Sequence, residues 1–115
     1  MSNKEGKIEM ILTTTSVLQE YDVEEYLGVV ASEAIMGANI VRDVFASVRD
    51  IVGGRSNAYE GKLAEAREIA TKEMKEQAVK YGANAIIGID YDFETVGQGM
   101  LMCIATGTAV KVVKK

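Results

Sequence analysis

The chain has 115 residues, of which 48% are hydrophobic and 26% charged, values typical of one soluble globular domain. Its net charge of −4 offers no basic footprint for nucleic acid, and no apolar run approaches the ~20 residues of a membrane span. The absence of histidine excludes Ser-His and Cys-His catalytic pairs, and the single cysteine, Cys103, excludes an intrachain disulfide. We expect a cytoplasmic protein, because the start MSNKEGKIEM also lacks an apolar signal region.

The first third of the chain predicts two strands. Residues 1–7 are polar and predict a disordered tail, followed by a short strand over Ile8–Leu12 and an exposed hydroxyl run, Thr13–Ser16. Tyr21–Met36 predicts a long strand that ends before Gly37. Alternation gives this strand two mainly apolar faces, with Leu27, Val29, Ala31 and Ile35 on one and Tyr26, Val30, Ala34 and Met36 on the other.

Two helices are predicted next. Asn39 can cap a helix over residues 40–52, which has apolar residues at helical spacing and ends at Gly53 and Gly54. Asn57 can cap a second helix, Ala58–Tyr81, with Glu60 placed to reach back to it. The apolar stripe of this helix is mostly small and allows close packing on a sheet: Leu63, Ala66, Ala70, Met74, Ala78 and Tyr81. The outer face carries the expected ion pairs Glu68–Lys72 and Glu76–Lys80.

A hairpin is predicted to complete the chain. After Gly82, the strand Asn84–Thr95 turns at residues 97–99 into a last strand, Met100–Val113. Strict alternation places Ala85, Ile87, Ile89, Tyr91 and Phe93 on one face and Ile86, Gly88, Asp90, Asp92 and Glu94 on the other. The last strand is apolar on both faces, with Met100, Met102 and Ile104 opposite Leu101, Cys103 and Ala105.

The expected fold is therefore α+β: a single two-layer domain with a small, mainly antiparallel sheet and two helices on one face. Two helices can cover one face of such a sheet, yet two of its long strands are apolar on both faces. The uncovered face predicts a homo-oligomer that buries it between copies.

Several motifs of the chain, GGRSNAYEGKLAEAREIA, KYGANAIIGIDYD and GTAV, resemble the YbjQ (UPF0145) family of small bacterial and archaeal proteins. The resemblance covers roughly residues 11–113. Its motif carriers are Gly28, Gly37, Asn39, Asp43, Gly53, Gly54, Arg55, Ser56, Tyr59, Glu60, Gly82, Ala83, Asn84, Ala85, Gly107, Thr108, Ala109 and Val110. It implies a dodecin-like fold assembled as a ring, a pentamer. It also implies a heavy-metal-binding label, but no established activity.

The first candidate site is the segment Gly53-Gly54-Arg55-Ser56 with Tyr59 and Glu60. Glycines let backbone amides approach a ligand, the helix N-terminus favours anions, and Arg55 can clamp an anion. The alternative is structural. In that interpretation the glycines turn the chain, Glu60 caps the helix, Tyr59 packs on the turn, and Arg55 pairs with an acidic neighbour or another subunit.

Two candidate metal sites lie in the hairpin. Asp90, Asp92 and Glu94 share one strand face and could bind a hard cation, or they could form a solvated strand end. Cys103, with Met100 and Met102, carries soft ligands, but the thiol and the thioethers point to opposite strand faces. A ring would bring copies of Cys103 together; otherwise Cys103 is a small buried hydrophobe.

These features favour a self-assembling cytoplasmic protein without enzymatic activity that binds a small ligand or a heavy-metal ion at subunit junctions. We expect neither nucleic acid nor a membrane as a partner. One alternative is an enzyme that acts on a small anionic substrate through Arg55, with Asp43 or Glu60 as base. The other is a pure structural scaffold.

Overall fold

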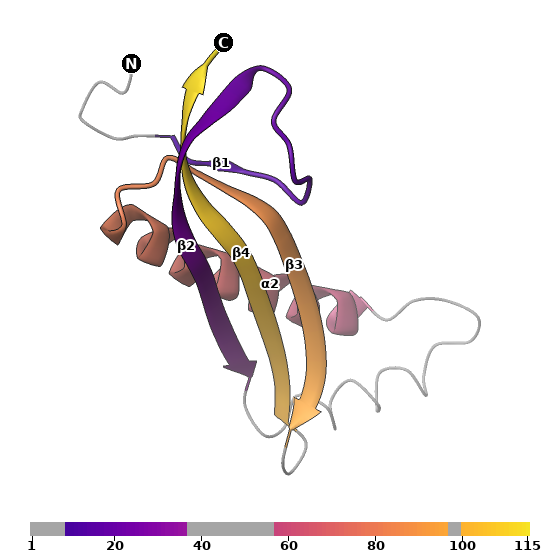
Figure 1. Ribbon diagram of the computed structural model, residues 1–115. Coiled ribbons are helices and arrows are strands. Elements are labelled where there is room, and N and C mark those ends of the chain that lie inside the picture. Colours follow the sequence, from indigo (N-terminus) through magenta and orange to yellow (C-terminus); the bar gives the residue numbers. More distant parts are fainter. Residues whose placement is uncertain (1–8, 37–56, 97–99) are drawn as a thin grey trace.

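The computed structural model describes residues 9–36, 57–96 and 100–115, and for residues 57–60 it describes the backbone alone. Within these ranges the elements are β1 (Ile11–Leu12), β2 (Tyr21–Met36), α2 (Asn57–Lys80), β3 (Ala85–Val96) and β4 (Met100–Lys114). The strands form one sheet in the order β1-β3-β4-β2, with α2 against one face (Figure 1). The expected α+β class is confirmed. The predicted tail, the helix over residues 40–52 and the turn at 97–99 lie outside the described residues.

The three long strands agree with the predicted bounds to within one residue. Strand β4 lies between β2 and β3 and is antiparallel to both, so the expected hairpin of β3 and β4 is confirmed. The first strand is shorter than expected. Its 2 residues pair in parallel with the start of β3, at Ile11↔Ala85 and Leu12↔Ile86, which makes the sheet mixed.

The main core lies between α2 and the sheet. Ala66, Ala70, Met74 and Ala78 of the helix are fully buried, as the small-residue stripe predicts. They pack in one cluster with Val30, Ala34, Ile86, Ile89, Cys103, Ala105 and Ala109 of the strands. The two ends of the predicted stripe are less buried than its middle: Leu63 is half-buried and Tyr81 is 50% exposed. The predicted pairs Glu68–Lys72 and Glu76–Lys80 are not formed within 4.0 Å; among the described side chains, Lys62 and Glu65 approach to 3.9 Å.

Helix α2 ends in a glycine motif. Gly82 has a φ of +84°, its N–H donates to the Val79 carbonyl at 2.9 Å, and the Ala83 N–H donates to the Ala78 carbonyl at 3.0 Å. These two bonds satisfy helix carbonyls that would otherwise lack partners. The chain then enters β3 through Asn84, whose side-chain amide exchanges two hydrogen bonds with the backbone of Val112 at 2.8 and 3.0 Å.

Of the three register shifts in the described sheet, two change which residues share a face from what the sequence predicts. Between Ile87 and Asp90 of β3 one extra residue is inserted relative to β4, and Gly88 at this shift has a φ of +62°. Ile86 therefore shares the helix-facing side with Ile89, Tyr91 and Phe93, while Ala85 and Ile87 point away from the helix. Strict alternation predicts a different grouping, because it assumes no bulge. A bulge moves every residue beyond it to the opposite face of the strand.

The second shift lies next to Gly28 in β2. The pairing moves from Tyr26↔Val110 to Gly28↔Ala109, which leaves Leu27 as the extra residue. Leu27 packs against the main core together with Val30, rather than on the side of Val29 as predicted. Gly28 has a φ of +131°, a conformation that residues with a Cβ rarely adopt.

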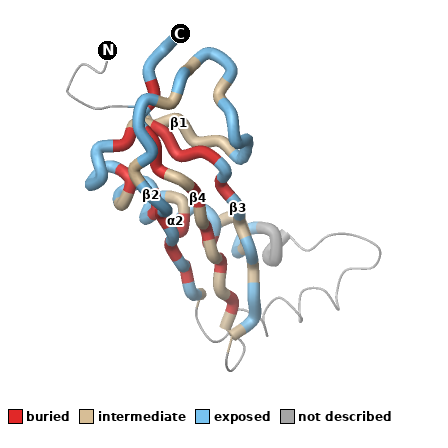
Figure 2. The backbone as a smooth tube through the Cα atoms, in the orientation of Figure 1, coloured by how far each residue is buried: buried red, intermediate tan, exposed pale blue. Residues whose placement is uncertain are grey.

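Part of the face opposite α2 is covered by the chain's own N-terminal segment. Ala85, Ile87, Val110 and Val112 are buried there in a second, smaller cluster with Ile11, Leu18, Tyr21 and Val23. Figure 2 shows buried residues concentrated in the upper half of β3, near this segment. The prediction that the whole face needs another chain to cover it is therefore too broad, because residues 11–23 cover its upper part.

The hydroxyl run helps to hold this segment in place. The Gly88 N–H donates to the Thr15 carbonyl at 2.8 Å, and the Ile89 N–H donates to the Thr13 carbonyl at 3.1 Å. Thr13 and Thr15 also bond to each other through their hydroxyls at 2.8 Å. The bulge thus gains hydrogen-bond partners from the N-terminal segment.

Among the described residues, no helix combines the length and the hydropathy that a membrane span needs.

Candidate functional site

The lower half of the face opposite α2 is an exposed surface with an apolar centre and acidic sides, here called the open face. Directly paired residues of neighbouring strands point to the same side of a sheet, so Ile35 lies beside Met102 and Glu33 beside Ile104. Val29 is 72% exposed and Ile35 56% exposed, while Met102 and Ile104 are partly exposed. Exposed apolar side chains that adjoin on one face are typical of an interaction surface.

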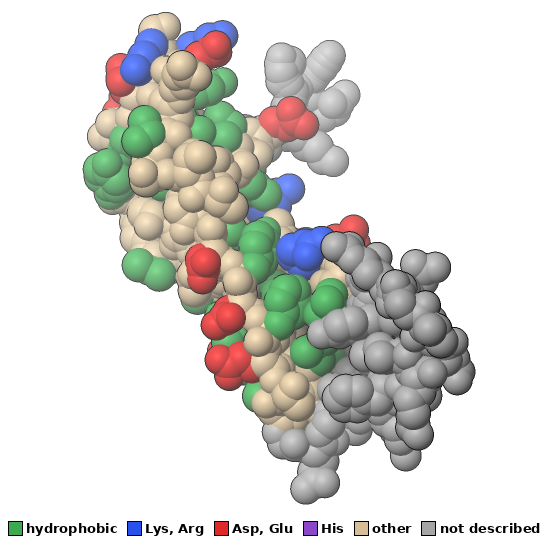
Figure 3. Space-filling model, turned by 90° about the vertical axis from the view of Figure 1, so that its right-hand side faces the viewer, with side chains coloured by type: hydrophobic (Ala, Val, Ile, Leu, Met, Phe, Trp, Pro, Cys, Tyr) green, Lys and Arg blue, Asp and Glu red, His purple; other side chains and the backbone are tan. Residues whose placement is uncertain are grey.

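The predicted carboxylate site borders this open face. Asp90, Asp92 and Glu94 pair with Thr106, Ile104 and Met102 of β4 and are all exposed. A row of acidic side chains is visible at the lower left of the surface in Figure 3. Among the described residues, no group of three or more Cys, Asp or Glu side chains is arranged to hold a metal ion. The described residues of a single chain therefore do not place these carboxylates as a cation site.

Cys103 lies on the other side of the sheet, in the main core beneath α2. Its side chain is fully buried, and burial raises the pKa of the thiol, an effect that the positive charge of Arg67 partly offsets. The thiol form is the one that binds metals poorly, because the thiolate is the ligand. Met100 and Met102 face away from it, as the alternation of β4 predicts. The position of Cys103 therefore favours the role of a small buried hydrophobe.

Most residues of the predicted anion site lie outside the part of the chain that the structure describes. Gly53, Gly54, Arg55 and Ser56 lie outside the described residues. Tyr59 and Glu60 belong to the first turn of α2 by their backbone, and their side chains are not described.

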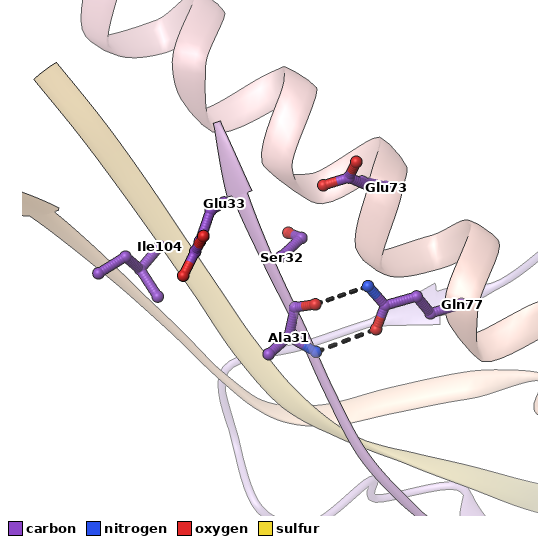
Figure 4. Close-up of a pocket in the computed structure, with 6 residues that line it drawn as sticks. All are labelled: Ala31, Ser32, Glu33, Glu73, Gln77 and Ile104. Atoms are coloured by element: carbon purple, nitrogen blue, oxygen red, sulfur yellow. Dashed lines mark hydrogen bonds between the residues drawn. The ribbon is translucent and has the colours of Figure 1, made fainter. Parts of the chain in front are cut away.

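A pocket of about 420 Å³ opens at the edge of the sheet between α2 and β2, and sequence reasoning missed it. Figure 4 shows its lining: Ala31, Ser32, Glu33, Glu73, Gln77 and Ile104. The side-chain amide of Gln77 accepts from the Ala31 N–H at 3.1 Å and donates to the Ala31 carbonyl at 2.6 Å, and the buried Ser32 hydroxyl donates to the Ala70 carbonyl. Glu33 of β2 and Glu73 of α2 thus bring two carboxylates to a pocket at the β2 edge, with which no further described strand pairs.

A second pocket, of about 280 Å³, lies between α2 and β3. Its lining is mainly basic and hydroxylic: Arg67, Glu68, Thr71, Lys72, Lys75 and Tyr91. The hydroxyls of Thr71 and Tyr91 are 2.7 Å apart. The spacing of Arg67, Thr71 and Lys75 by four residues along α2 was a signal that could have revealed this row.

Together, the mixed sheet, the long helix on one side and the open face on the other define a small α+β domain with an exposed apolar surface. A family model described as "Putative heavy-metal-binding" matches residues 10–113, and relatives named UPF0145 protein match 90% of the chain, so the chain belongs to the UPF0145 family. A UPF0145 protein of Geobacillus thermodenitrificans is 62% identical over 103 residues, which is 90% of this chain and 99% of that protein. One of Bacillus cereus is 63% identical over 103 residues, 90% of this chain and 100% of that protein. The resemblance seen in the motifs is therefore confirmed.

A solved structure shares the fold. It is a protein with unknown function of the DUF74 family from Pediococcus pentosaceus, similar with a TM-score of 0.58 over 90% of this chain and 98% of that chain. The sequence identity is 17%, so the likeness concerns the fold alone.

Proposed function

We propose that this protein is a self-assembling cytoplasmic binding protein, in which copies bury the open face against one another and hold a metal ion or small ligand at their junctions. The observation that carries the proposal is the exposure of Ile35, at 56%, beside the partly exposed Met102, with Val29, at 72%, exposed further along the same face next to Thr108. Burying apolar area contributes roughly 25 cal/mol per Å². A ring of five copies is the arrangement that the family resemblance implies.

The β2-edge pocket supports binding at a junction rather than within one chain. Glu33 and Glu73 supply two carboxylates, fewer than the six to eight oxygen ligands that a Ca²⁺ ion takes. Glu33 lies on β2 and Glu73 on α2, and no further described strand pairs with β2 on this side, so a neighbouring copy can contribute further ligands there. Asp90 and Asp92 border the same open face from its β3 side and offer a second set of oxygen ligands.

Assembly is tested by native mass spectrometry and light scattering at micromolar concentration. We expect a defined oligomer for the natural chain and its dissociation by Ile35→Lys, because a charge would then be buried at the junction. Val79→Lys is the matched control, since Val79 is also an exposed apolar residue, at 62%, but lies on α2. A stable monomer, or equal dissociation by both variants, would overturn the proposal.

Metal binding needs its own titration. Equilibrium dialysis with Zn²⁺, Cd²⁺ and Cu⁺ is expected to load less than one ion per chain, because ligands from several copies share each ion. Glu33→Gln and Asp92→Asn then lower the uptake of Zn²⁺ and Cd²⁺, while Cys103→Ser leaves it unchanged because Cys103 is buried. If none of the three ions is retained by the oligomer, the metal part of the proposal is refuted.

A further inference from the structure

The pocket between α2 and β3 concentrates positive charge in a chain that is acidic overall. Of its described lining residues, three are cations, Arg67, Lys72 and Lys75, and one is a carboxylate, Glu68, which gives these residues a summed charge of +2 in a chain of net charge −4. Basic side chains also gather near the middle of the surface in Figure 3. Convergent cations around a small concave surface raise the local concentration of anions.

The geometry of α2 aligns these groups. Arg67, Thr71 and Lys75 recur every four residues and therefore form a row along one side of the helix. This row borders the buried stripe that includes Ala70 and Met74, so it flanks the sheet rather than pointing straight into solvent. Tyr91 reaches it from β3, and its hydroxyl lies 2.7 Å from that of Thr71.

The hydroxyl protons can be assigned by counting donors. The Thr71 hydroxyl donates its one proton to the Arg67 carbonyl at 2.7 Å. It must therefore accept from the Tyr91 hydroxyl in their 2.7 Å contact. The Tyr91 oxygen then has no proton left to donate and presents a lone pair. The pocket thus combines cations for an anionic group with an acceptor for a donor group of the same ligand.

We propose that this pocket binds a small phosphate monoester that also carries a hydroxyl group. A local charge of +2 matches the dianion of a phosphate monoester, and the fork of Arg67 suits two phosphate oxygens at once. The ligand hydroxyl donates to the Tyr91 oxygen. The volume of about 280 Å³ is at the small end for ligand pockets and limits the ligand to a few carbon atoms around the phosphate.

This site belongs to one chain and does not depend on the proposed assembly. The lining side chains within the described ranges come from α2 and β3 of the same molecule. The open face, which carries the proposed oligomer, consists of residues on the other side of the sheet, such as Ile35 and Met102. The two proposals can therefore fail separately.

The test is isothermal titration calorimetry at low salt with glycerol 3-phosphate, inorganic phosphate and glycerol as probes. We expect glycerol 3-phosphate to bind with a dissociation constant of roughly 1 mM or better, more tightly than inorganic phosphate, and glycerol to show no binding. Arg67→Gln and Lys75→Gln should each weaken glycerol 3-phosphate at least roughly tenfold. Lys80→Gln, which removes a cation from the same helix outside the pocket, should not change it.

The acceptor role of Tyr91 has its own readout. Tyr91→Phe should lower the affinity for glycerol 3-phosphate to that for inorganic phosphate and leave inorganic phosphate unaffected. Circular dichroism and a urea midpoint confirm that each variant is folded. If Tyr91→Phe is unfolded, methyl phosphate, which lacks the hydroxyl group, takes its place in the test and should bind the natural chain no more tightly than inorganic phosphate. Absence of binding by the natural chain, or an equal loss in Lys80→Gln, would overturn the proposal.

Discussion

The side-chain amide of Gln77 pairs with the backbone of Ala31 through two hydrogen bonds, from the Ala31 N–H at 3.1 Å and to the Ala31 carbonyl at 2.6 Å. Strand β2 is the last strand of the sheet on this side, so its outer backbone groups face no further strand among the described residues. Gln77 takes the place that a neighbouring strand would occupy at this point. It thereby blocks the pairing of another strand with the β2 backbone at Ala31.

Removing this amide should both destabilise the chain and open the edge. Gln77→Ala is expected to lower the free energy of unfolding by about 1–2 kcal/mol, because two hydrogen bonds are lost. Urea denaturation measures this change, and Glu76→Ala, an exposed neighbour on α2, should change stability little. A faster rise in light scattering on mild heating would show that the freed edge promotes aggregation. Equal stability of the two variants would contradict the role of Gln77.

Gly107 is predicted to be intolerant of a side chain. A Cβ at this position would lie 2.6 Å from Cγ2 of Ile86 and 3.2 Å from Cγ1 of Ile89, both in the main core. Gly107→Ala should therefore cost about 1–3 kcal/mol through overpacking. Gly61 in α2 is the opposite case, since a Cβ there meets nothing within 4 Å. Gly61→Ala should stabilise the chain by up to about 1 kcal/mol through helix propensity, and thermal unfolding of both variants compares the two.

Gly88 is predicted to tolerate asparagine better than valine. Its φ of +62° is left-handed, and no atom lies within 4 Å of a Cβ placed there, so the cost is in the backbone rather than in a clash. That cost is about 1–2 kcal/mol for most residues and less for Asn. Chemical denaturation should rank the natural chain above Gly88→Asn and Gly88→Asn above Gly88→Val. Equal stability of the two variants would show that the bulge relaxes.

The buried thiol of Cys103 should make stability depend on alkaline pH. Burial raises its pKa in the folded chain, while the unfolded chain ionises at about 8.5. Above that pH the unfolded state binds fewer protons than the folded state, so the free energy of unfolding falls as pH rises towards the folded pKa. Urea unfolding between about pH 8 and pH 10 should show a steeper decline for the natural chain than for Cys103→Ala. Identical slopes would mean that the thiol ionises freely in the fold.

The periodic patterns of the sequence predicted the elements well. The alternation of β2 and β4 and the stripe from Ala66 to Ala78 are long, and each residue in them contributes to the same periodic signal. It was harder to predict which residues of β2 and β3 face the helix beyond Gly28 and Gly88. A register shift lies next to each of these glycines of positive φ, and the alternation of apolar and polar residues does not reveal such a shift.

The candidate sites were predicted less well than the elements. Gln77 meets Ala31 across 46 residues, and Thr71 meets Tyr91 across 20, so neither contact shows in any local pattern. Cys103 attracted attention by its residue type, and Asp90 and Asp92 by residue type and a spacing of two along one strand. Residue type does not report burial, which removes Cys103 from the surface, or the distances between ligands.

The bulge at Gly88 has a consequence for how substitutions in β3 combine. On its N-terminal side, Ala85 and Ile87 pack with the segment that precedes β2, while on its C-terminal side Ile89 and Phe93 pack beneath the helix. One strand is thus shared between two hydrophobic clusters on opposite sides of the sheet. Substitutions at Ile87 and Phe93 should therefore have independent energetic effects, whereas substitutions at Ile86 and Phe93, which share the main core, should not.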